Sequence, residues 1–261
     1  MMKRTLLVLT ALFAFTAIVH AQKCMIKMKS GKIKNADSIS ADSSGNLTVK
    51  NKKFTTKIKR KEYVYAWVPM STGLKAISKK IASNDNKAAL ELVAKYHSKY
   101  KNLGWDFYCI YMKALAESKL KKDTDAIKTL QAIVGREVKN PKNEKYLLSS
   151  YKLLATLYIN AAKFNDANAI LKKIEYAQDP QIAAFALNAL GDILNRKNKK
   201  QDAVNKYLQT VLLFQTANPE RAEALCRVAN LLKELKDNRC VKYSNMLKKE
   251  YPKSEFIKQL K

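Results

Sequence analysis

Three Asn-Pro or Asp-Pro pairs recur at a fixed interval, and they constrain the fold more than any other feature of this sequence. Asn140-Pro141, Asp179-Pro180 and Asn218-Pro219 are each 39 residues apart. Asn or Asp at a helix N-cap satisfies an N–H group that has no partner in the first turn, and proline at the next position lacks an N–H. Three such helix starts at equal spacing predict an array of helical repeats.

The second helix expected in each unit shows the same repeat. A small residue is followed four positions later by a bulky one, and the small position recurs every 38 residues on average from Ala88 to Cys240. Small side chains let antiparallel helices approach closely, and the bulky residue one turn later fills the space between units. The pairs are Ala88 and Leu92, Ala126 and Leu130, Ala167 and Leu171, and Ala203 and Tyr207, with Cys240 in the last small position.

The first helices carry the residues of a known repeat pattern. That pattern is aromatic-x-x-Leu-Gly-x-x-Tyr, then Ala-x-x-x-Phe in the next helix and Pro near the end. The chain therefore resembles the tetratricopeptide-repeat family over residues 75–261, which implies a mainly α solenoid of about five helical hairpins. The matching residues are Tyr151, Leu154, Ala155, Tyr158, Ala167 and Leu171; then Leu187, Leu190, Gly191, Leu194, Ala203 and Tyr207; and finally Leu225, Val228, Ala229, Leu232, Cys240 and Pro252.

The repeat also explains Gly191 and the basic run that follows it. Glycine inside a helix costs about 1 kcal/mol relative to alanine, but here it falls where the first helix is expected to cross its partner closely. Residues 195–200 (NRKNKK) then form the turn between two helices, where cations suit the helix C-terminus. The residues predicted to pack the repeats together are Ala155, Gly191 and Ala229 in first helices, and Ala126, Ala167, Ala203 and Cys240 in second helices.

Residues 22–70 have a different periodicity and are predicted to form a small β module. Short stretches there alternate apolar or β-branched residues with polar ones, and turns are expected at Gly31 and at residues 42–46. Five short strands are expected, in a pattern that resembles the SH3-like modules of bacterial envelope proteins or a simple meander. Residues 71–74 are predicted to be a linker to the helical repeat domain, residues 75–261.

The first 21 residues have the layout of a secretory signal peptide. A charged start precedes an apolar stretch at residues 6–19, and Val19-His20-Ala21 fits a small-x-small cleavage site. The apolar stretch is shorter than the roughly 18–20 residues that span a bilayer. We therefore expect cleavage near Ala21, a periplasmic or secreted chain, and no transmembrane helix after cleavage.

Residue types that carry catalysis are scarce in the predicted mature chain. Its single histidine, His97, cannot by itself build a multi-histidine metal site. No glycine-rich phosphate loop, GxSxG, HExxH or CxxC pattern occurs. We therefore expect neither an enzyme, nor a metal site, nor a cofactor. The four cysteines, Cys24, Cys109, Cys226 and Cys240, are expected to be free or weakly paired thiols, although export permits disulfides.

The formal net charge of +28 raises the question of an acidic partner. Lysine supplies 43 of the 50 basic residues, whereas phosphate and base recognition favour the planar fork of arginine. Because the lysines are spread along the chain, a solvated surface is the simpler interpretation, and no specific nucleic acid is expected. The alternative is a polyanion or glycan site on the β module, formed by Lys50, Lys52, Lys53, Lys57, Lys59, Arg60 and Lys61 with Phe54, Tyr63, Tyr65 and Trp67 nearby.

The tetratricopeptide resemblance implies a concave groove lined by the first helices. Amides and lysines there suit an extended peptide backbone or a carboxylate. The sequence therefore favours a scaffold that binds envelope proteins or peptides, with an anionic envelope polymer as the alternative partner. Replacing Asn188 and Asn230 together is expected to abolish partner capture and leave stability nearly unchanged. The candidate groove residues are Lys152, Thr156, Asn188, Asp192, Asn195, Asn230 and Lys233.

Overall fold

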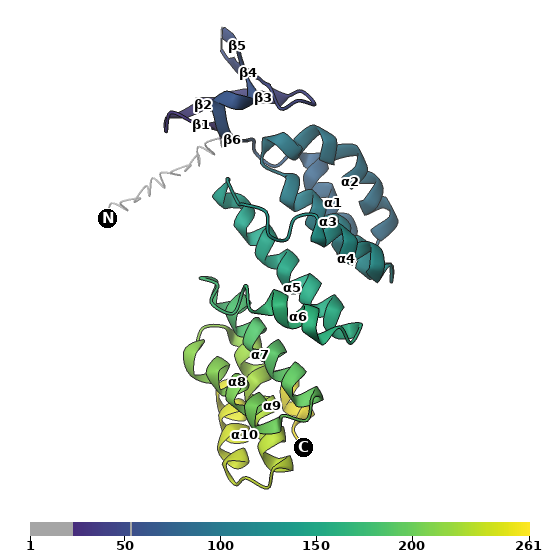
Figure 1. The fold of residues 1–261 in the computed structure, drawn as a ribbon, viewed down its shortest axis with the longest axis vertical. Coiled ribbons are helices and arrows are strands. Elements are labelled where there is room, and N and C mark those ends of the chain that lie inside the picture. The colour runs from purple at the N-terminus through teal and green to yellow at the C-terminus, as the bar shows by residue number, and fades with distance from the viewer. Residues whose placement is uncertain (1–22, 53) are drawn as a thin grey trace, which may run out of the picture.

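A computed structural model describes residues 23–52 and 54–261. A β region lies at one end of an elongated molecule, and five antiparallel helical hairpins follow it to the other end (Figure 1). The predicted signal peptide, residues 1–21, lies outside the described residues, as does Lys53 of the candidate polyanion site.

The β region contains two three-stranded antiparallel sheets. One has the strand order β2-β1-β6 and the other β3-β4-β5. In β1 and β4, buried residues alternate with more exposed ones, so one face of these strands packs into the hydrophobic core. The strands are β1 (Cys24–Met28), β2 (Ile33–Ala36), β3 (Ser38–Ala41), β4 (Leu47–Asn51), β5 (Phe54–Ile58) and β6 (Tyr63–Trp67).

The expectation of five strands is wrong by one, because the chain bends at Asp37. The N–H of Asp37 donates to Lys50 O at 3.1 Å, and its carboxylate accepts the N–H of Lys52 at 2.7 Å. These bonds tie the bend to the end of β4. The stretch that alternates as one strand in the sequence therefore forms two, with β2 paired to β1 and β3 paired to β4.

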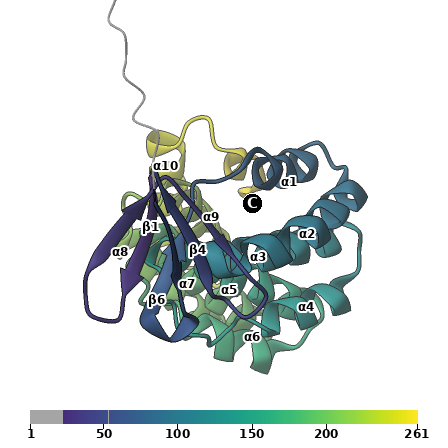
Figure 2. The same ribbon diagram turned by 90° about the horizontal axis from the view of Figure 1, so that it is seen from above.

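The helices alternate between two layers of the solenoid. Seen along the long axis, α3, α5, α7 and α9 lie on the inner side and the second helices on the outer side (Figure 2). The first helices are α1 (Thr72–Ala82), α3 (Asp106–Lys119), α5 (Glu144–Asn160), α7 (Pro180–Arg196) and α9 (Asn218–Glu234). The second helices are α2 (Asn86–Tyr100), α4 (Asp123–Gln131), α6 (Phe164–Leu171), α8 (Lys200–Leu213) and α10 (Arg239–Glu250).

The proline-marked helix starts differ from one another. Asp179 is the N-cap of α7, and its carboxylate accepts the N–H of Gln181 at 2.9 Å, as predicted. Asn140 instead caps the short 3-10 helix η3 (Pro141–Asn143), after which α5 begins. Asn218 is not a cap. It is the first residue of α9, and buried Ala217 takes the N-cap position, one residue before the predicted one.

All five hairpins use the same turn, although the turn residues differ in type. Each turn places one residue other than glycine in the left-handed region of φ. The next residue donates its N–H five positions back, as in the bond from Lys199 N to Leu194 O at 2.9 Å. This arrangement is the Schellman motif, which satisfies carbonyl groups at a helix C-terminus. The left-handed residues are Asn84, Lys121, Ala162, Asn198 and Lys236.

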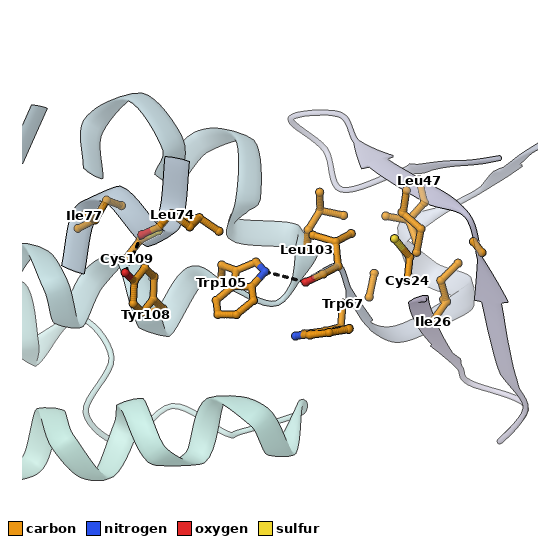
Figure 3. Packing of buried hydrophobic residues seen from close by; sticks show 14 of the residues in the cluster. Cys24, Ile26, Leu47, Trp67, Leu74, Ile77, Leu103, Trp105, Tyr108 and Cys109 are labelled. Atoms are coloured by element: carbon orange, nitrogen blue, oxygen red, sulfur yellow. Dashed lines mark hydrogen bonds between the residues drawn. The ribbon is translucent and has the colours of Figure 1, made fainter. Parts of the chain in front are cut away.

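The β region and the first hairpins share one hydrophobic core (Figure 3). The indole N–H of Trp105 donates to Val68 O at 2.9 Å, and the Tyr108 hydroxyl donates to Leu74 O at 2.8 Å. Residues 71–74, predicted to be a linker, include the start of α1, whose N-cap Ser71 accepts the N–H of Leu74 at 3.2 Å. The β module is therefore packed onto the repeats by its own core residues.

The small residues expected between helices lie at the predicted crossings. A Cβ on Gly191 would be 2.4 Å from Cε1 of Tyr207, so the α8 ring packs directly on the α7 backbone. Ala126, Ala155, Ala167 and Ala203 are completely buried, Ala229 is nearly so, and Cys240 is half-buried. In residues 23–52 and 54–261, no helix has both the length and the apolar character needed to cross a membrane.

Candidate functional site

Charged and amide side chains connect three first helices on the inner side of the solenoid. Lys152 of α5 reaches across α7 to Glu220 of α9, with 3.2 Å between Nζ and Oε1. The ammonium of Lys152 also lies 4.6 Å from the centroid of the Phe185 ring on α7. This set of contacts is called here the inner-face network, and its members are Lys152, Asn188, Asp192, Glu220, Glu223 and Arg227.

Asn188 is a buried member of the inner-face network. Its side chain is 2% exposed, and Nδ2 donates to Glu220 O at 2.8 Å and to Glu223 Oε2 at 3.4 Å. A ligand would reach this amide only if α7 and α9 separated. The burial of Asn188 leads us to expect that replacing Asn188 and Asn230 together lowers stability, because removing one partner of a buried hydrogen bond costs about 1–3 kcal/mol.

Asp192, one turn further along α7, bonds to α8 and α9. One carboxylate oxygen accepts the Tyr207 hydroxyl of α8 at 2.7 Å and also contacts the Arg227 guanidinium of α9. Arg227 in turn donates to Glu223 Oε1 at 2.6 Å. Asp192 thus has structural partners on both neighbouring helices.

Asn230 on α9 binds main chain. Its Nδ2 donates to Gln259 O at 2.8 Å, and its Oδ1 accepts the N–H of Lys261 at 2.8 Å. Leu260, between them, has the extended backbone angles φ −65° and ψ 130°. The main chain that Asn230 binds belongs to the segment of residues 254–261. This segment includes the 3-10 helix η4 (Glu255–Gln259) and packs apolar side chains on the last hairpin.

The remaining candidate groove residues are more accessible. Asn195 and Asn230 line a small cavity of about 170 Å³ together with Arg227 and Lys261. Thr156 donates its hydroxyl to Lys152 O of its own helix at 2.9 Å, and Lys233 is exposed. Of the seven predicted residues, three are therefore bonded within the network, although the side chain of one of them, Lys152, stays 39% exposed.

Glu220 and Arg227 belong to the network but are not among the groove residues predicted from the sequence. They lie on α9 with Glu223 at a spacing of three and four residues, which places all three on one helix face. That spacing was the available signal. Glu220 is 9% exposed, and its Oε2, like the Oδ1 of Asn188, has no hydrogen-bond partner among the described residues.

The described lysines of the alternative site are all exposed, whereas its arginine bonds to main chain. Lys50, Lys52 and Lys57 are exposed on the β4–β5 hairpin, at the end of the molecule far from α10 (Figure 1). Lys59 and Lys61 are exposed beside it. Arg60 turns back instead, with its Nη1 donating to Tyr63 O at 3.0 Å.

Of the aromatic residues expected near these lysines, only some offer an accessible ring. Phe54 is 76% exposed at the start of β5. Tyr63 and Trp67 are core residues, 2% and 5% exposed, so they cannot serve as open stacking platforms. Tyr65 is half-buried.

His97 and Cys109 are residue types that can take part in catalysis, but here one is bonded to a carboxylate and the other is buried. His97 Nε2 lies 2.6 Å from Asp106 Oδ1, and Arg136 Nη2 lies 2.7 Å from Asp106 Oδ2. Burial opposes ionisation of Asp106, but the bonds from His97 and Arg136 outweigh it and hold its pKa below the ordinary value. Burial raises the pKa of the Cys109 thiol to about 12, the opposite of an activated nucleophile.

All four cysteines are free thiols. Within the part of the chain that the structure describes, no three His, Cys, Asp or Glu residues are grouped in a way that could hold a metal ion.

No protein-family model matches this sequence, and no curated protein matches it. Among solved structures, a putative kinesin light chain from Podosopora anserina with nearly identical TPR-like repeats aligns with a TM-score of 0.53 at 14% identity, covering 70% of this chain and 96% of that chain. MamA aligns with a TM-score of 0.50 at 16% identity, covering 71% and 98%. The MamA RS-1 ArsTM double mutant aligns with a TM-score of 0.50 at 11% identity, covering 69% and 96%.

At these identities the likeness shows the fold, which is a tetratricopeptide-like α-solenoid preceded by a small all-β region.

Proposed function

We propose that this chain is a non-enzymatic scaffold that binds extended segments of other proteins on the inner side of its solenoid. The observation that carries the proposal is the pair of hydrogen bonds between Asn230 and the main chain at residues 259 and 261. An amide that donates and accepts in this way recognises extended backbone whatever its side chains are.

Two further features support the assignment. Asn195 of α7 lines the same small cavity as Asn230, and Lys233 is exposed one turn after Asn230 on α9, so a segment longer than the resident one would meet more polar groups. The inner-face network holds α5, α7 and α9 in fixed relative positions. A rigid binding surface loses less conformational entropy on binding than a flexible one.

Site-specific crosslinking in intact cells tests the proposal. A photoreactive residue at Asn195 or Lys233 should crosslink to partner proteins, which mass spectrometry would identify, and Asn230→Ala should reduce these crosslinks at least several-fold. Asn165→Ala on the exposed side of α6, outside the candidate groove, is the matched control. Crosslinks that persist unchanged in the Asn230→Ala variant would rule out the inner side as the binding surface.

A second candidate function, polyanion or glycan binding by the β4–β5 hairpin, is favoured by Phe54. Its ring is 76% exposed between the exposed residues Lys52 and Lys57. Binding by these lysines should weaken steeply as salt rises, whereas backbone recognition by Asn230 should change little. A photoreactive residue at Phe54 that captures a polymer, with no capture at Asn195, would favour this second function.

We also propose that the scaffold acts in the cell envelope, either in the periplasm or after secretion. The support is the signal-peptide layout of residues 1–21 and the loose SH3-like pattern of residues 22–70. N-terminal sequencing of the chain recovered from fractionated cells tests the first point. A chain that keeps residues 1–21 in the cytoplasmic fraction would contradict it.

A further inference from the structure

A cavity of about 580 Å³ lies where the β region meets the repeats. Its walls come from β6, from the 3-10 helix η2 (Lys101–Leu103), from the start of α3 and from residues 136–143 before α5. We call it the junction cavity. Its volume lies within the range of about 300–1,000 Å³ that is typical of small-molecule sites.

Two arginines face this cavity from different elements. Arg60 lies with Cζ 4.7 Å from the centroid of the Tyr63 ring, and Arg136 lies 4.9 Å from that of Phe107. The aromatic rings hold both guanidinium groups in place, which pre-organises their forked donors for an oxyanion. A chain with only seven arginines among 50 basic residues thus places two of them at one cavity.

The cations of the junction cavity outnumber its carboxylates. Asp106 is paired with His97 and with one N–H of Arg136, which leaves the other donors of this guanidinium available. Glu137 is 79% exposed and lies 3.9 Å from Lys139, a third cation of the lining, and Lys101 is a fourth. Helix α3 also begins at the cavity, and its N-cap residue Trp105 supplies no side-chain bond to the first turn. The positive end of the helix dipole therefore adds to the attraction for an anion.

Two buried amides in the lining have atoms without hydrogen-bond partners in the described part of the chain. They are Nδ2 of Asn140, whose residue is 3% exposed, and Oδ1 of Asn143, whose residue is 7% exposed. Buried polar atoms are normally paired, so unpaired ones at a cavity point to a missing partner. One atom is a donor and the other an acceptor, which an oxyanion alone does not satisfy.

We propose that the junction cavity binds an anionic sugar, with a carboxylate or phosphate group next to free hydroxyls. The oxyanion accepts hydrogen bonds from Arg60, Arg136 and the Nδ2 of Asn140. A neighbouring hydroxyl donates to the Oδ1 of Asn143. The half-buried ring of Tyr65, also in the lining, offers a surface for the sugar ring. This site is separate from Asn230 and does not depend on the proposed peptide binding.

Titration calorimetry on the full chain tests the proposal with four probes: glucose 6-phosphate, glucuronate, glucose and inorganic phosphate. We expect at least one of the two charged sugars to bind more tightly than both neutral glucose and inorganic phosphate. The charged sugar that binds identifies whether the oxyanion is a phosphate or a carboxylate. Arg60→Gln and Arg136→Gln should each weaken binding about tenfold or more, the usual loss for a charge-assisted hydrogen bond.

Matched variants keep the test independent of folding. Arg60→Lys keeps the charge without the fork and should bind more weakly than the native chain but more tightly than Arg60→Gln. Arg196→Gln removes another arginine that lies over an aromatic ring, 5.9 Å from the centroid of Phe164 and away from the cavity, and should bind normally. The proposal is overturned if neither charged sugar binds, if inorganic phosphate or glucose binds as tightly, or if a folded Arg60→Lys chain binds like the native one.

Discussion

The inner-face network and the junction cavity are built from the same residue types but differ in what they leave open. Both contain arginines beside aromatic rings, paired carboxylates and buried amides with one unpartnered atom. In the network these groups bond to one another, and the adjoining cavity measures about 170 Å³. At the junction, about 580 Å³ remains.

This difference in open space arises from the kinds of elements that pack together at the two places. Neighbouring first helices have the same geometry, so their facing side chains interdigitate, as Asn188 and Glu223 do. At the junction a strand, a loop and a helix end meet with unrelated geometries, and their side chains cannot interdigitate in the same way. Polar clusters inside a repeat array therefore act as internal contacts, while those at its boundary with another fold are available to ligands.

Replacing Gly191 with leucine tests the claim that the repeat interior has no spare room, and it should have the largest effect. A Cβ alone would be 2.4 Å from the Tyr207 ring, which is almost completely buried. We expect a loss of about 3 kcal/mol in the free energy of unfolding, measured by urea denaturation. The control, Ala169→Leu on the exposed side of α6, should cost less than about 0.5 kcal/mol. Wild-type stability of the Gly191 variant would contradict the close crossing.

Replacing Gly104 with alanine examines the wall of the junction cavity, with a smaller expected effect. Gly104 has φ +86°, and a Cβ would be 2.9 Å from Cδ1 of Trp67. Strain and steric conflict together should lower the free energy of unfolding by about 2 kcal/mol. Gly135→Ala is the matched control, because its φ is +90° but nothing lies within 4 Å of its Cβ position. The control should lose about 1 kcal/mol from strain alone. Equal losses in the two variants would show that the junction wall is not tightly packed there.

Acid should weaken the junction through Asp106, the smallest of the three effects. Since the folded pKa of Asp106 is lowered by His97 and Arg136, its stabilisation is present above the unfolded value of about 3.9 and is lost as pH falls through the lowered folded value. Asp106→Asn should therefore cost about 1–2 kcal/mol at pH 7 and progressively less below about pH 4. Urea denaturation at pH 7 and pH 3 measures the difference. A cost that does not shrink in acid would mean that the ion cluster adds nothing.

Most of the fold could be predicted from local periodicity in the sequence. The proline-marked starts and the small residues of the second helices predict five hairpins and their crossings, because these patterns depend on residues a few positions apart. The tetratricopeptide resemblance implied that the first helices line the inner side, which is where α3, α5, α7 and α9 lie (Figure 2). It also explained Gly191 before its neighbour Tyr207 could be identified.

The turns and bends were less visible in the sequence. The five Schellman turns use Asn, Lys and Ala in the left-handed position, where glycine would have been the recognisable signal. The split between β2 and β3 at Asp37 depends on bonds to residues 50–52, on a strand that comes later in the chain. Neither feature has a local pattern that distinguishes it.

The sequence by itself determined that this chain is a repeat array with a β region before it, because both follow from local periodicity. Only the tertiary structure decided which inward residues can meet a ligand. Asp192 and Asn230 occupy equivalent repeat positions, yet the first is bonded to side chains of the neighbouring helices and the second holds main chain. Differences of this kind depend on contacts between residues far apart in the sequence. Lys152 and Glu220, for example, are 68 residues apart. A contact of that kind exists only once the solenoid has curved enough to bring α5 and α9 together.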